Sequence, residues 1–419
     1  VEDRAVHGWY RFVLSFPPHL VDEYIARFKL DGSSRLLDPF CGTGTTLVQA
    51  KKRGIPSVGI EANPVASFAS RVKIDWRPDP VALKAHARRI YENVSEEFKS
   101  SGIFDEPLLR LISGDRSSVL RVLDQEQEKL LLRDSISALP LHKTLVLLEH
   151  IRKENHSDFL RHEMLALAKA LVNSISNLRF GPEVGVGTIK EDAPVLRLWQ
   201  EEVAVMAEDL SHIKDRAPVS SEVHSADARQ LKNLFEPQSI DAVITSPPYP
   251  NEKDYTRTTR LELVLLGFVN SKSELQALKK NLIRSNTRSV YKEDDDDQWI
   301  ASNERIREIA DKIEKRRIEL GKTSGFERLY ARVTKLYFGG MFRHLRDMQA
   351  VLKPGAHLAY VVGDQASYLR VMIRTGEIIS DIARSLGYEV IGIDLFRTRL
   401  ATATREQLRE EIVVLRWPG

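Results

Sequence analysis

The sequence predicts an α/β fold: one open, mainly parallel sheet of seven strands with helical inserts. Short apolar runs recur along the 419 residues, and segments with helical periodicity separate most of them. The first run also passes directly into a glycine-containing loop that opens a helix, as in Rossmann-like proteins. Strands that alternate with helices are typical of a parallel sheet covered by its connections. The expected strands span residues 35–38, 57–60, 222–224, 241–245, 356–362, 389–393 and 411–415.

The ends of the elements carry local signals. The strand at 35–38 stops before a proline, residues 47–53 have helical character, and Gly54 is a natural C-cap. The strand at 57–60 follows directly, which completes a strand–helix–strand unit. Much later, the helix expected at 377–385 again ends at a glycine before the next strand. The same alternation is therefore expected at both ends of the chain.

The composition is that of a globular protein in solution, with 42% hydrophobic and 29% charged residues. No segment is apolar for long enough to cross a bilayer, and the first residues lack a basic-then-apolar leader, so we expect a cytoplasmic protein without membrane contacts. The single cysteine, Cys41, excludes an internal disulfide and a cysteine-rich zinc site. The 62 Lys and Arg against 59 Asp and Glu give a net charge of +3. A surface for nucleic acid must therefore come from local clusters of charge.

A glycine loop follows the first strand, where open α/β sheets bind their ligands. Gly42 and Gly44 in the run D-P-F-C-G-T-G-T-T let the backbone approach a ligand closely. The third glycine of a dinucleotide fingerprint and the Gly-Lys-Ser/Thr of a P-loop are both missing, so a phosphate-binding loop is disfavoured. Asp38 before the loop and Glu61 after the second strand offer carboxylates instead. Such a pair suits an ammonium group and a ribose diol, unless both acids only lie on the surface near helix ends.

The glycine loop at 38–46, taken with G-I-E-A-N-P at 59–64, resembles the cofactor motifs of S-adenosylmethionine-dependent DNA amino-methyltransferases, which act on cytosine N4 or adenine N6. This resemblance implies a Rossmann-like class I methyltransferase sheet and S-adenosyl-L-methionine as the cofactor. It places the methionine end of the cofactor near Asp38 and the ribose near Glu61. The run L-S-F-P-P-H-L at 14–20 resembles the N-terminal cofactor motif more loosely, and a simple helix start explains it nearly as well. The cofactor residues that the resemblance implies are Phe16, Pro17, Asp38, Phe40, Cys41, Gly42, Gly44, Thr45, Glu61, Ala62, Asn63, Asp227, Ala228 and Ser246, and no metal ligand is expected.

The fourth expected strand ends in T-S-P-P-Y at 245–249. An exocyclic amino group is a weak nucleophile, because its lone pair is delocalised, and its methylation needs hydrogen-bond acceptors that hold the nitrogen. The Ser246 hydroxyl and the Pro247 carbonyl can accept, and the φ angles fixed by Pro247 and Pro248 preorganise them. Tyr249 offers a flat face on which a flipped base can stack. The run resembles the family's catalytic motif, which implies that all four residues are catalytic; a Pro-Pro turn with a packing tyrosine is the alternative.

Two further positions have competing roles. Asp227 follows the third strand, and the resemblance implies that it accepts from the adenine of the cofactor beside Ala228, whereas a helix N-cap is the competing role. Methylation at cytosine C5 uses a cysteine nucleophile. Because Cys41 lies within the glycine loop, we expect it to face the cofactor rather than the base, or to fill space in the loop, which excludes C5 chemistry. The resemblance also implies that Tyr255 and Arg257 are candidate contacts to the base or the DNA backbone, and that residues 359–364 support the pocket.

The sheet-forming segments predict one catalytic domain with two inserts. The methyltransferase domain is expected to cover residues 1–76, 222–269 and 327–419. The insert at 77–221 has helical periodicity and is a candidate target-recognition region. The insert at 270–326 is strongly charged and is a candidate DNA-contacting region.

Each insert contains one unusual stretch. The first has a glycine-containing break at 180–187, and the second has an acidic run at 293–297 that is expected to be a solvated loop before an exposed helix. Basic residues around the second insert could contact phosphates, although each could equally be an ordinary solvated cation. These candidates are Lys279, Lys280, Arg284, Arg288, Lys292, Arg397 and Arg399.

The motifs together predict an enzyme that transfers a methyl group to the exocyclic amino group of a base flipped out of duplex DNA, in restriction-modification or defence. A cognate restriction endonuclease is then an expected partner. Ser246 stands where adenine-specific relatives more often carry Asp or Asn, which favours cytosine N4. Adenine N6 methylation, an RNA amino-methyltransferase and a non-catalytic nucleic-acid-binding subunit stay open as alternatives.

Overall fold

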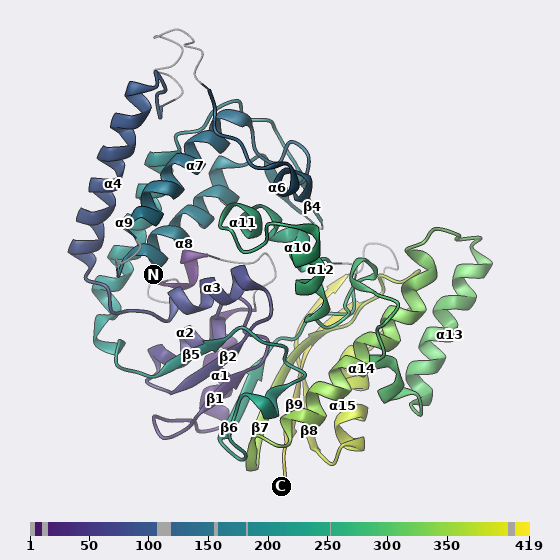
Figure 1. Ribbon diagram of the computed structural model, residues 1–419. Helices are drawn as coiled ribbons and strands as arrows, with labels where there is room; N and C mark the ends of the chain where they lie inside the picture. The colour runs from purple at the N-terminus through teal and green to yellow at the C-terminus, as the bar shows by residue number, and fades with distance from the viewer. Residues whose placement is uncertain are drawn as a thin grey trace. The chain divides into compact units, whose positions relative to one another are not determined.

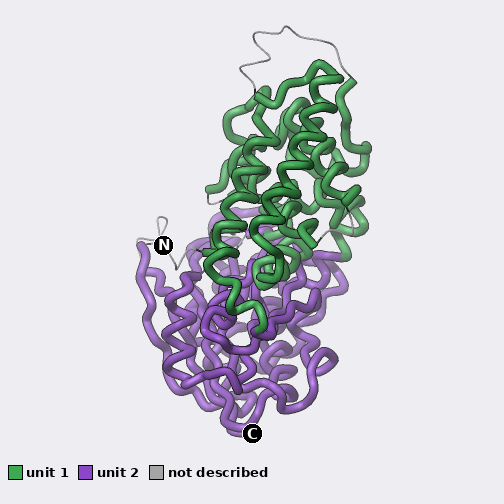
Figure 2. The backbone as a smooth tube through the Cα atoms, turned by 90° about the vertical axis from the view of Figure 1, so that its left-hand side faces the viewer, with its two compact units in different colours: residues 1–15, 64–218, 255–277 green, residues 16–63, 219–254, 278–419 purple. Residues whose placement is uncertain are grey.

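The computed structural model describes residues 5–10, 16–106, 119–154, 158–181, 183–251, 253–400 and 407–419. The chain forms two compact units, each assembled from segments that are far apart in the sequence (Figure 2). We call them the sheet unit and the helical unit. The sheet unit comprises residues 16–63, 219–254 and 278–419, and the helical unit comprises residues 1–15, 64–218 and 255–277.

The sheet unit contains a seven-stranded sheet in the order β5-β2-β1-β6-β7-β9-β8 (Figure 1). The neighbours from β5 to β7 pair in parallel, and β9 runs antiparallel to both β7 and β8. Every expected strand is present, so the prediction of a seven-stranded, mostly parallel α/β sheet is confirmed. The strands are β1 (Leu36–Asp38), β2 (Ser57–Ile60), β5 (Ser221–His224), β6 (Ile240–Thr245), β7 (Leu352–Gly363), β8 (Glu389–Leu400) and β9 (Gln407–Arg416).

The strand order reverses at β1. From β1 the chain moves outward through β2 to β5, and it then returns to the opposite side of β1 to form β6. In open α/β sheets the crevice outside the carboxyl ends of the strands at such a point is the usual place for a ligand. The topology therefore predicts a ligand site at the carboxyl ends of β1 and β6.

Helices cover both faces of the sheet, which explains why its central strands are almost continuously apolar. The helices of this unit are α1 (Pro18–Arg27), α2 (Thr45–Lys52), α13 (Glu304–Glu319), α14 (Tyr330–Met348) and α15 (Thr375–Ser385). Leu36 and Leu37 are both fully buried, yet they belong to different clusters because side chains alternate along a strand. Leu36 packs in a cluster with Leu20 of α1, and Leu37 in one that contains Met341 of α14.

Two adjacent glycines inside α14 make room for the acidic run. Glycine costs about 1 kcal/mol relative to alanine in a helix interior, so a pair of them needs a structural reason. A Cβ at Gly339 would collide with the main-chain oxygen of Asp296, and a Cβ at Gly340 would lie 3.3 Å from its carboxylate. Asp294 and Asp296 are largely buried: Asp294 pairs with the nearby Arg284, and Asp296 pairs with Arg229 and Arg343, which are distant in the sequence. The expectation of a solvated acidic loop is therefore wrong for these two residues.

The helical unit consists mainly of packed helices. They are α3 (Pro64–Lys73), α4 (Pro80–Ser100), α6 (Gln125–Leu130), α7 (Ala138–Lys153), α8 (Leu160–Ala170), α9 (Val195–Ile213), α10 (Tyr255–Thr258) and α11 (Arg260–Leu265), while α12 (Lys272–Lys280) runs across the boundary between the units. Asp79 caps α4 by accepting from the amides of Val81 and Ala82. In the glycine-containing break at 180–187, β3 (Leu178–Phe180) and β4 (Val184–Val186) form an antiparallel hairpin that was not expected; Pro182 lies outside the described residues.

The compact units do not coincide with the expected domains. Residues 64–76 and 255–269, expected in the catalytic domain, belong to the helical unit, whereas residues 278–326 belong to the sheet unit. The second insert, from residue 278 onward, therefore forms part of the same compact body as the sheet, and its residues 270–277 belong to the helical unit. Within the described ranges, none of the helices combines the length and the apolar character needed to span a bilayer.

Candidate active site

The glycine loop and the T-S-P-P-Y corner meet at the switch point of the sheet. β1 and β6 are parallel neighbours, with Leu37 opposite Val243, so both chain segments leave the sheet at the same edge. Thr245 Oγ1 donates a hydrogen bond of 2.6 Å to Asp38 Oδ1, and Thr46 Oγ1 donates one of 3.2 Å to the Ile244 carbonyl. Two motifs that are far apart in the sequence are thus joined by side-chain hydrogen bonds.

The glycine loop is held in a sharp turn between β1 and α2. Gly42 and Gly44 have φ angles of 51° and 86°, a left-handed conformation that residues with a Cβ rarely adopt. The Gly44 amide bonds to the Cys41 carbonyl at 2.7 Å, and α2 begins at Thr45. The thiol of Cys41 is buried against β2, where a Cβ at Gly59 would lie 2.8 Å from its sulfur. Cys41 therefore fills space beneath the loop, as its packing interpretation implies.

Asp38 is fully buried at the start of this loop. Its Oδ1 accepts from Thr245 and, at 3.2 Å, from the Phe40 amide. Burial raises the pKa of Asp38 to about 6, although these hydrogen bonds act in the opposite direction. Its Oδ2 is also buried and has no hydrogen-bond partner among the residues that the structure describes. Leaving a buried carboxylate oxygen unpaired is costly, which suits a site that receives a donor from a ligand.

Glu61 lies directly after β2, within reach of the same loop. Its two oxygens accept from the amides of Gly42 at 2.9 Å and Asn63 at 2.7 Å. Burial raises the pKa of Glu61 to about 7 and outweighs these hydrogen bonds, while the negative charge of Asp38 adds a smaller increase. A carboxylate oxygen can accept more than one hydrogen bond, so both oxygens can still bind hydroxyl groups.

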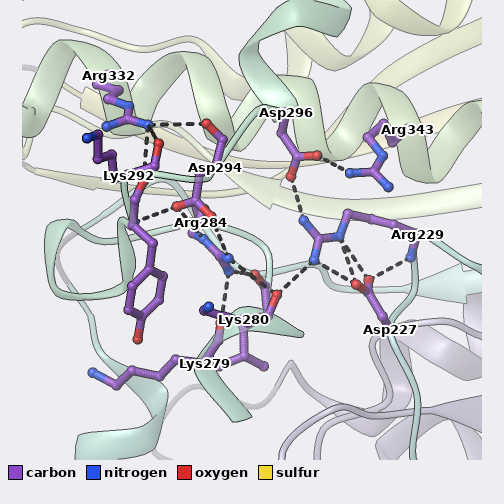
Figure 3. A network of polar contacts seen from close by, with 12 residues as sticks. Asp227, Arg229, Lys279, Lys280, Arg284, Lys292, Asp294, Asp296, Arg332 and Arg343 are labelled. Carbon is purple, nitrogen blue, oxygen red and sulfur yellow. Dashed lines mark hydrogen bonds and ion pairs between the residues drawn. The ribbon is translucent and has the colours of Figure 1, made fainter. Parts of the chain in front are cut away.

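The loop after β5 carries Asp227 and Ala228. The carboxylate of Asp227 binds the guanidinium of Arg229, with Nη2 at 2.6 Å, and Arg229 also contacts Asp296 at 2.5 Å (Figure 3). Asp227 caps no helix, because the short 3-10 turn that follows begins only at Leu231. The N-cap alternative is therefore wrong, and an ion pair that was not expected from the sequence takes its place.

At the T-S-P-P-Y corner, Ser246 Oγ donates to the Val361 carbonyl at 3.2 Å. Because this bond uses the only hydrogen of the hydroxyl, its lone pairs are left to accept from another group. Tyr249 lies against Gly363 at the end of β7, where a Cβ would approach the ring to 2.9 Å. Pro247 is buried, and Tyr249 is partly exposed.

His344 of α14 was not expected at the site, yet it contacts several of its residues. Its Nδ1 lies 2.8 Å from the Ala228 carbonyl, its Nε2 lies 2.7 Å from the Tyr360 hydroxyl, and Phe40 packs edge-on against its ring at 4.8 Å. Burial lowers the pKa of His344 to about 4, so the ring is neutral at pH 7. A single histidine in an amphipathic helix gives no signal in the sequence; the unusual Gly339-Gly340 pair next to it is the closest hint.

The remaining expected residues are scattered. Phe16 packs beside α1 and Pro17 precedes it, whereas Leu14 and Ser15 lie outside the described residues. Tyr255 and Arg257 belong to α10 in the helical unit. Ala62 lies between Glu61 and the buried Asn63, before α3.

The expected phosphate contacts divide into buried and exposed residues. Lys279 and Arg284 are buried in ion pairs with Asp254 at 2.8 Å and Asp294 at 2.7 Å, so the expectation is wrong for both. The side chains that lie on the surface are Lys280, Arg288, Lys292, Arg397 and Arg399.

No protein-family model matches the sequence. Among solved structures, TrmN from Thermus thermophilus superposes on this chain with a TM-score of 0.30 and 10% sequence identity. The match covers 99% of this chain and 53% of TrmN, so this chain spans about half the length of TrmN. At that score the superposition carries no argument.

Curated relatives match far more extensively. Type II methyltransferase M.BsoBI of Geobacillus stearothermophilus is 27% identical over 450 residues, which cover 99% of this chain and 85% of the relative. Type II methyltransferase M.AvaI of Anabaena variabilis is 25% identical over 464 residues, or 100% and 87% of the two chains. Type II methyltransferase M.MjaII of Methanocaldococcus jannaschii is 39% identical over 71 residues, which are 17% of this chain and 13% of the relative. The resemblance expected from the motifs is confirmed, and the chain is a homologue of the type II methyltransferases.

Proposed function

We propose that this protein transfers a methyl group from S-adenosyl-L-methionine to the exocyclic amino group of a base flipped out of duplex DNA, as the modification enzyme of a restriction-modification system. The observation that carries the proposal is the hydrogen bond between Thr245 and Asp38, which joins the expected cofactor loop to the expected catalytic corner. The curated relatives support it, because type II methyltransferases act on DNA in such systems.

The residues around the glycine loop fit the proposed cofactor. The unpaired, buried Oδ2 of Asp38 suits the ammonium group of a methionine moiety, and the oxygens of Glu61 suit ribose hydroxyls. The left-handed glycines Gly42 and Gly44 keep the loop free of Cβ atoms where a ligand would approach. When bound, S-adenosylmethionine supplies the electrophilic methyl group.

The catalytic corner would bind and orient the amino group. Ser246 offers its lone pairs as one acceptor, and the Pro247 carbonyl offers a second on a segment whose φ angles are fixed by proline. Acceptors that are ordered before the base arrives need no reorganisation during the reaction, which lowers the barrier. Tyr249 offers its ring to the flipped base and so recovers part of the unstacking cost of a few kcal/mol.

We infer cytosine N4 as the target, because the side-chain acceptor at the corner is a serine. Ser246 stands where adenine-specific members of the family more often have Asp or Asn. An uncharged acceptor is a weak base, so we expect the proton to leave the nitrogen after methyl transfer, when its acidity has increased.

The proposal is tested with S-adenosylmethionine carrying a labelled methyl group. The purified chain is incubated with duplex DNA of mixed sequence and, in parallel, with RNA, and both are digested to nucleosides. Label in N4-methylcytosine is expected. Label in N6-methyladenine would correct the base, and label in 5-methylcytosine, in RNA alone or in neither polymer would overturn the proposal.

A matched pair of variants ties the activity to the corner. Ser246→Ala removes the acceptor, and we expect it to lower the turnover number by about a hundredfold, as for other preorganised polar groups in active sites. The control is Ser239→Ala: Ser239 lies just before the start of β6, and its hydroxyl donates to the local Glu236 carbonyl. This variant should transfer the label at the normal rate.

A further inference from the structure

The loop at residues 225–230 leaves the sheet at its edge. It follows β5, an edge strand of the sheet, and leads only into a single 3-10 turn at Leu231–Asn233. The glycine loop, by contrast, is held between a central strand and α2. Besides the packing of Ala226 against the hydrophobic core, two side-chain attachments hold Asp227 and Ala228 in place.

His344 supplies one attachment. A backbone carbonyl can only accept, so the 2.8 Å contact with the Ala228 carbonyl requires the hydrogen of His344 to be on Nδ1. Nε2 is then the acceptor for the Tyr360 hydroxyl at 2.7 Å. The ring is fully buried and both of its nitrogens are used, so the Ala228 carbonyl fixes its tautomer, and the two contacts, to Ala228 and to Tyr360 of β7, fix its orientation.

Asp296 supplies the second attachment through Arg229. Figure 3 shows the Arg229 guanidinium between the carboxylates of Asp227 and Asp296. Asp296 also binds Arg343 at 2.5 Å, and the side chains of Arg229 and Asp296 are only 8% and 5% exposed. Charges buried to this degree are stable only when they are paired, so the chain of ion pairs resists displacement of any member.

Both attachments lead to one stretch of α14. Gly339 and Gly340 admit the Asp296 segment, while Arg343 and His344, four positions later on the same helix, bind Asp296 and Ala228. Residues four apart lie on one face of a helix. This face of α14 and the acidic segment together hold the loop at Ala228 and Arg229, and Arg229 in turn holds Asp227.

We propose that His344 and Asp296 are positioning residues for cofactor binding, acting through the Ala228 carbonyl and the Arg229–Asp227 ion pair. This inference rests on the proposed function, in which Asp227 and Ala228 border the adenine of the cofactor. This role requires no contact between either side chain and the cofactor. They fix the loop before binding, so the cofactor does not have to order it.

The test is calorimetric titration of the full chain with S-adenosylhomocysteine. His344→Leu removes both ring bonds and should weaken binding about tenfold, as expected for an unpaired buried carbonyl in a loop that must then be ordered. His344→Asn places an amide donor near the position of Nδ1 and should restore most of the affinity. Tyr388→Phe is the control, because it removes another buried bond to α14, from the Tyr388 hydroxyl to the Leu345 carbonyl, away from the loop.

A second pair keeps the inference open to refutation if His344→Leu does not fold. Asp296→Asn should weaken binding several-fold, whereas Asp294→Asn, in the same acidic run but paired with Arg284, should leave it unchanged. Wild-type affinity in both His344→Leu and Asp296→Asn would overturn the inference, and so would equal losses in the two controls. Absence of binding by the wild-type chain would instead overturn the proposed function, on which the inference depends.

Discussion

Thr245 Oγ1 lies 2.6 Å from Asp38 Oδ1, although 207 positions separate the two residues in the sequence. The threonine ends β6 and the aspartate ends β1, so the bond crosses the switch point of the sheet. It also opposes the effect of burial on Asp38, since a donor stabilises the ionised carboxylate and lowers its pKa. The Thr245 hydroxyl therefore both joins the ends of β1 and β6 and favours the ionised form of Asp38.

Thr245→Val tests this link, because valine has the same shape but no hydroxyl. The pKa of Asp38 should rise further, so that fewer molecules carry the charge that attracts an ammonium group. We expect about a tenfold loss of S-adenosylhomocysteine affinity at pH 7, measured by calorimetry, in line with loss of a hydrogen bond to a charged group. Thr334→Val removes a buried threonine bond inside α14 and is the matched control. Equal affinities in the two variants would contradict the prediction.

The raised pKa of Asp38 also predicts how the stability of the ligand-free chain depends on pH. Burial raises this pKa from 3.8 to about 6, so the folded chain holds the proton more tightly than the unfolded chain does. As the pH rises from about 4 to about 6, the unfolded state releases this proton first and the folded state becomes relatively less stable, by about 3 kcal/mol at most. Above that window the difference stays constant.

Asp38→Asn removes this titration. Relative to the wild type, the variant should gain unfolding free energy as the pH rises from 4 to 6.5, whatever its stability at the lower end. Denaturant unfolding at several pH values measures the difference, in which the titration of Glu61 largely cancels, because burial raises the pKa of Glu61 to about 7 and the Asp38 charge adds only a smaller increase. A difference that does not change with pH would show that Asp38 titrates normally.

Substitution of Gly363 should affect the stacking of the base on Tyr249 without affecting cofactor binding. An alanine Cβ there would lie 2.9 Å from the Tyr249 ring, so Gly363→Ala must displace the ring from the corner. Base–aromatic stacking contributes about 1–3 kcal/mol, so kcat/KM for DNA should fall about tenfold or more. The affinity for S-adenosylhomocysteine should not change. Gly392→Ala in β8, where a Cβ would meet no atom within 4 Å, should behave as the wild type in both assays.

Local patterns in the sequence were sufficient to predict the seven strands. Most of the strands contain an apolar run bounded by turn signals, and parallel neighbours bring Asp38 and Thr245 to one edge. The attachments of the loop at residues 225–230 could not be foreseen, because they depend on pairings between distant segments. Asp296 looked solvated within an acidic run, but its partners Arg229 and Arg343 are 67 and 47 positions away.

Loss of the Cys41 thiol should leave methyl transfer unchanged. Its thiol packs against Gly59 beneath the glycine loop, so it is not available to attack a base. Cys41→Ala should cost about 1 kcal/mol of unfolding free energy, as expected for a small cavity, and should transfer labelled methyl groups at a rate within twofold of the wild type. A folded Cys41→Ala protein without transferase activity would reopen C5 chemistry.

Arg284 and Lys292 are close in the sequence and were expected to act alike on DNA, but the structure predicts opposite behaviour. The guanidinium of Arg284 is 4% exposed and pairs with Asp294, so Arg284→Gln leaves a buried carboxylate uncompensated and should cost about 3–5 kcal/mol of unfolding free energy. Lys292 is exposed, so Lys292→Gln should change stability by less than about 0.5 kcal/mol.

If Lys292 contacts a phosphate, its removal lowers the slope of log affinity against log salt concentration by about one unit. We expect that decrease for Lys292→Gln and an unchanged slope for Arg284→Gln. DNA titrations between about 50 and 200 mM salt measure the slope, because phosphate contacts respond strongly in this range. A reduced slope in a fully stable Arg284→Gln protein would mean that the buried pair opens when DNA binds.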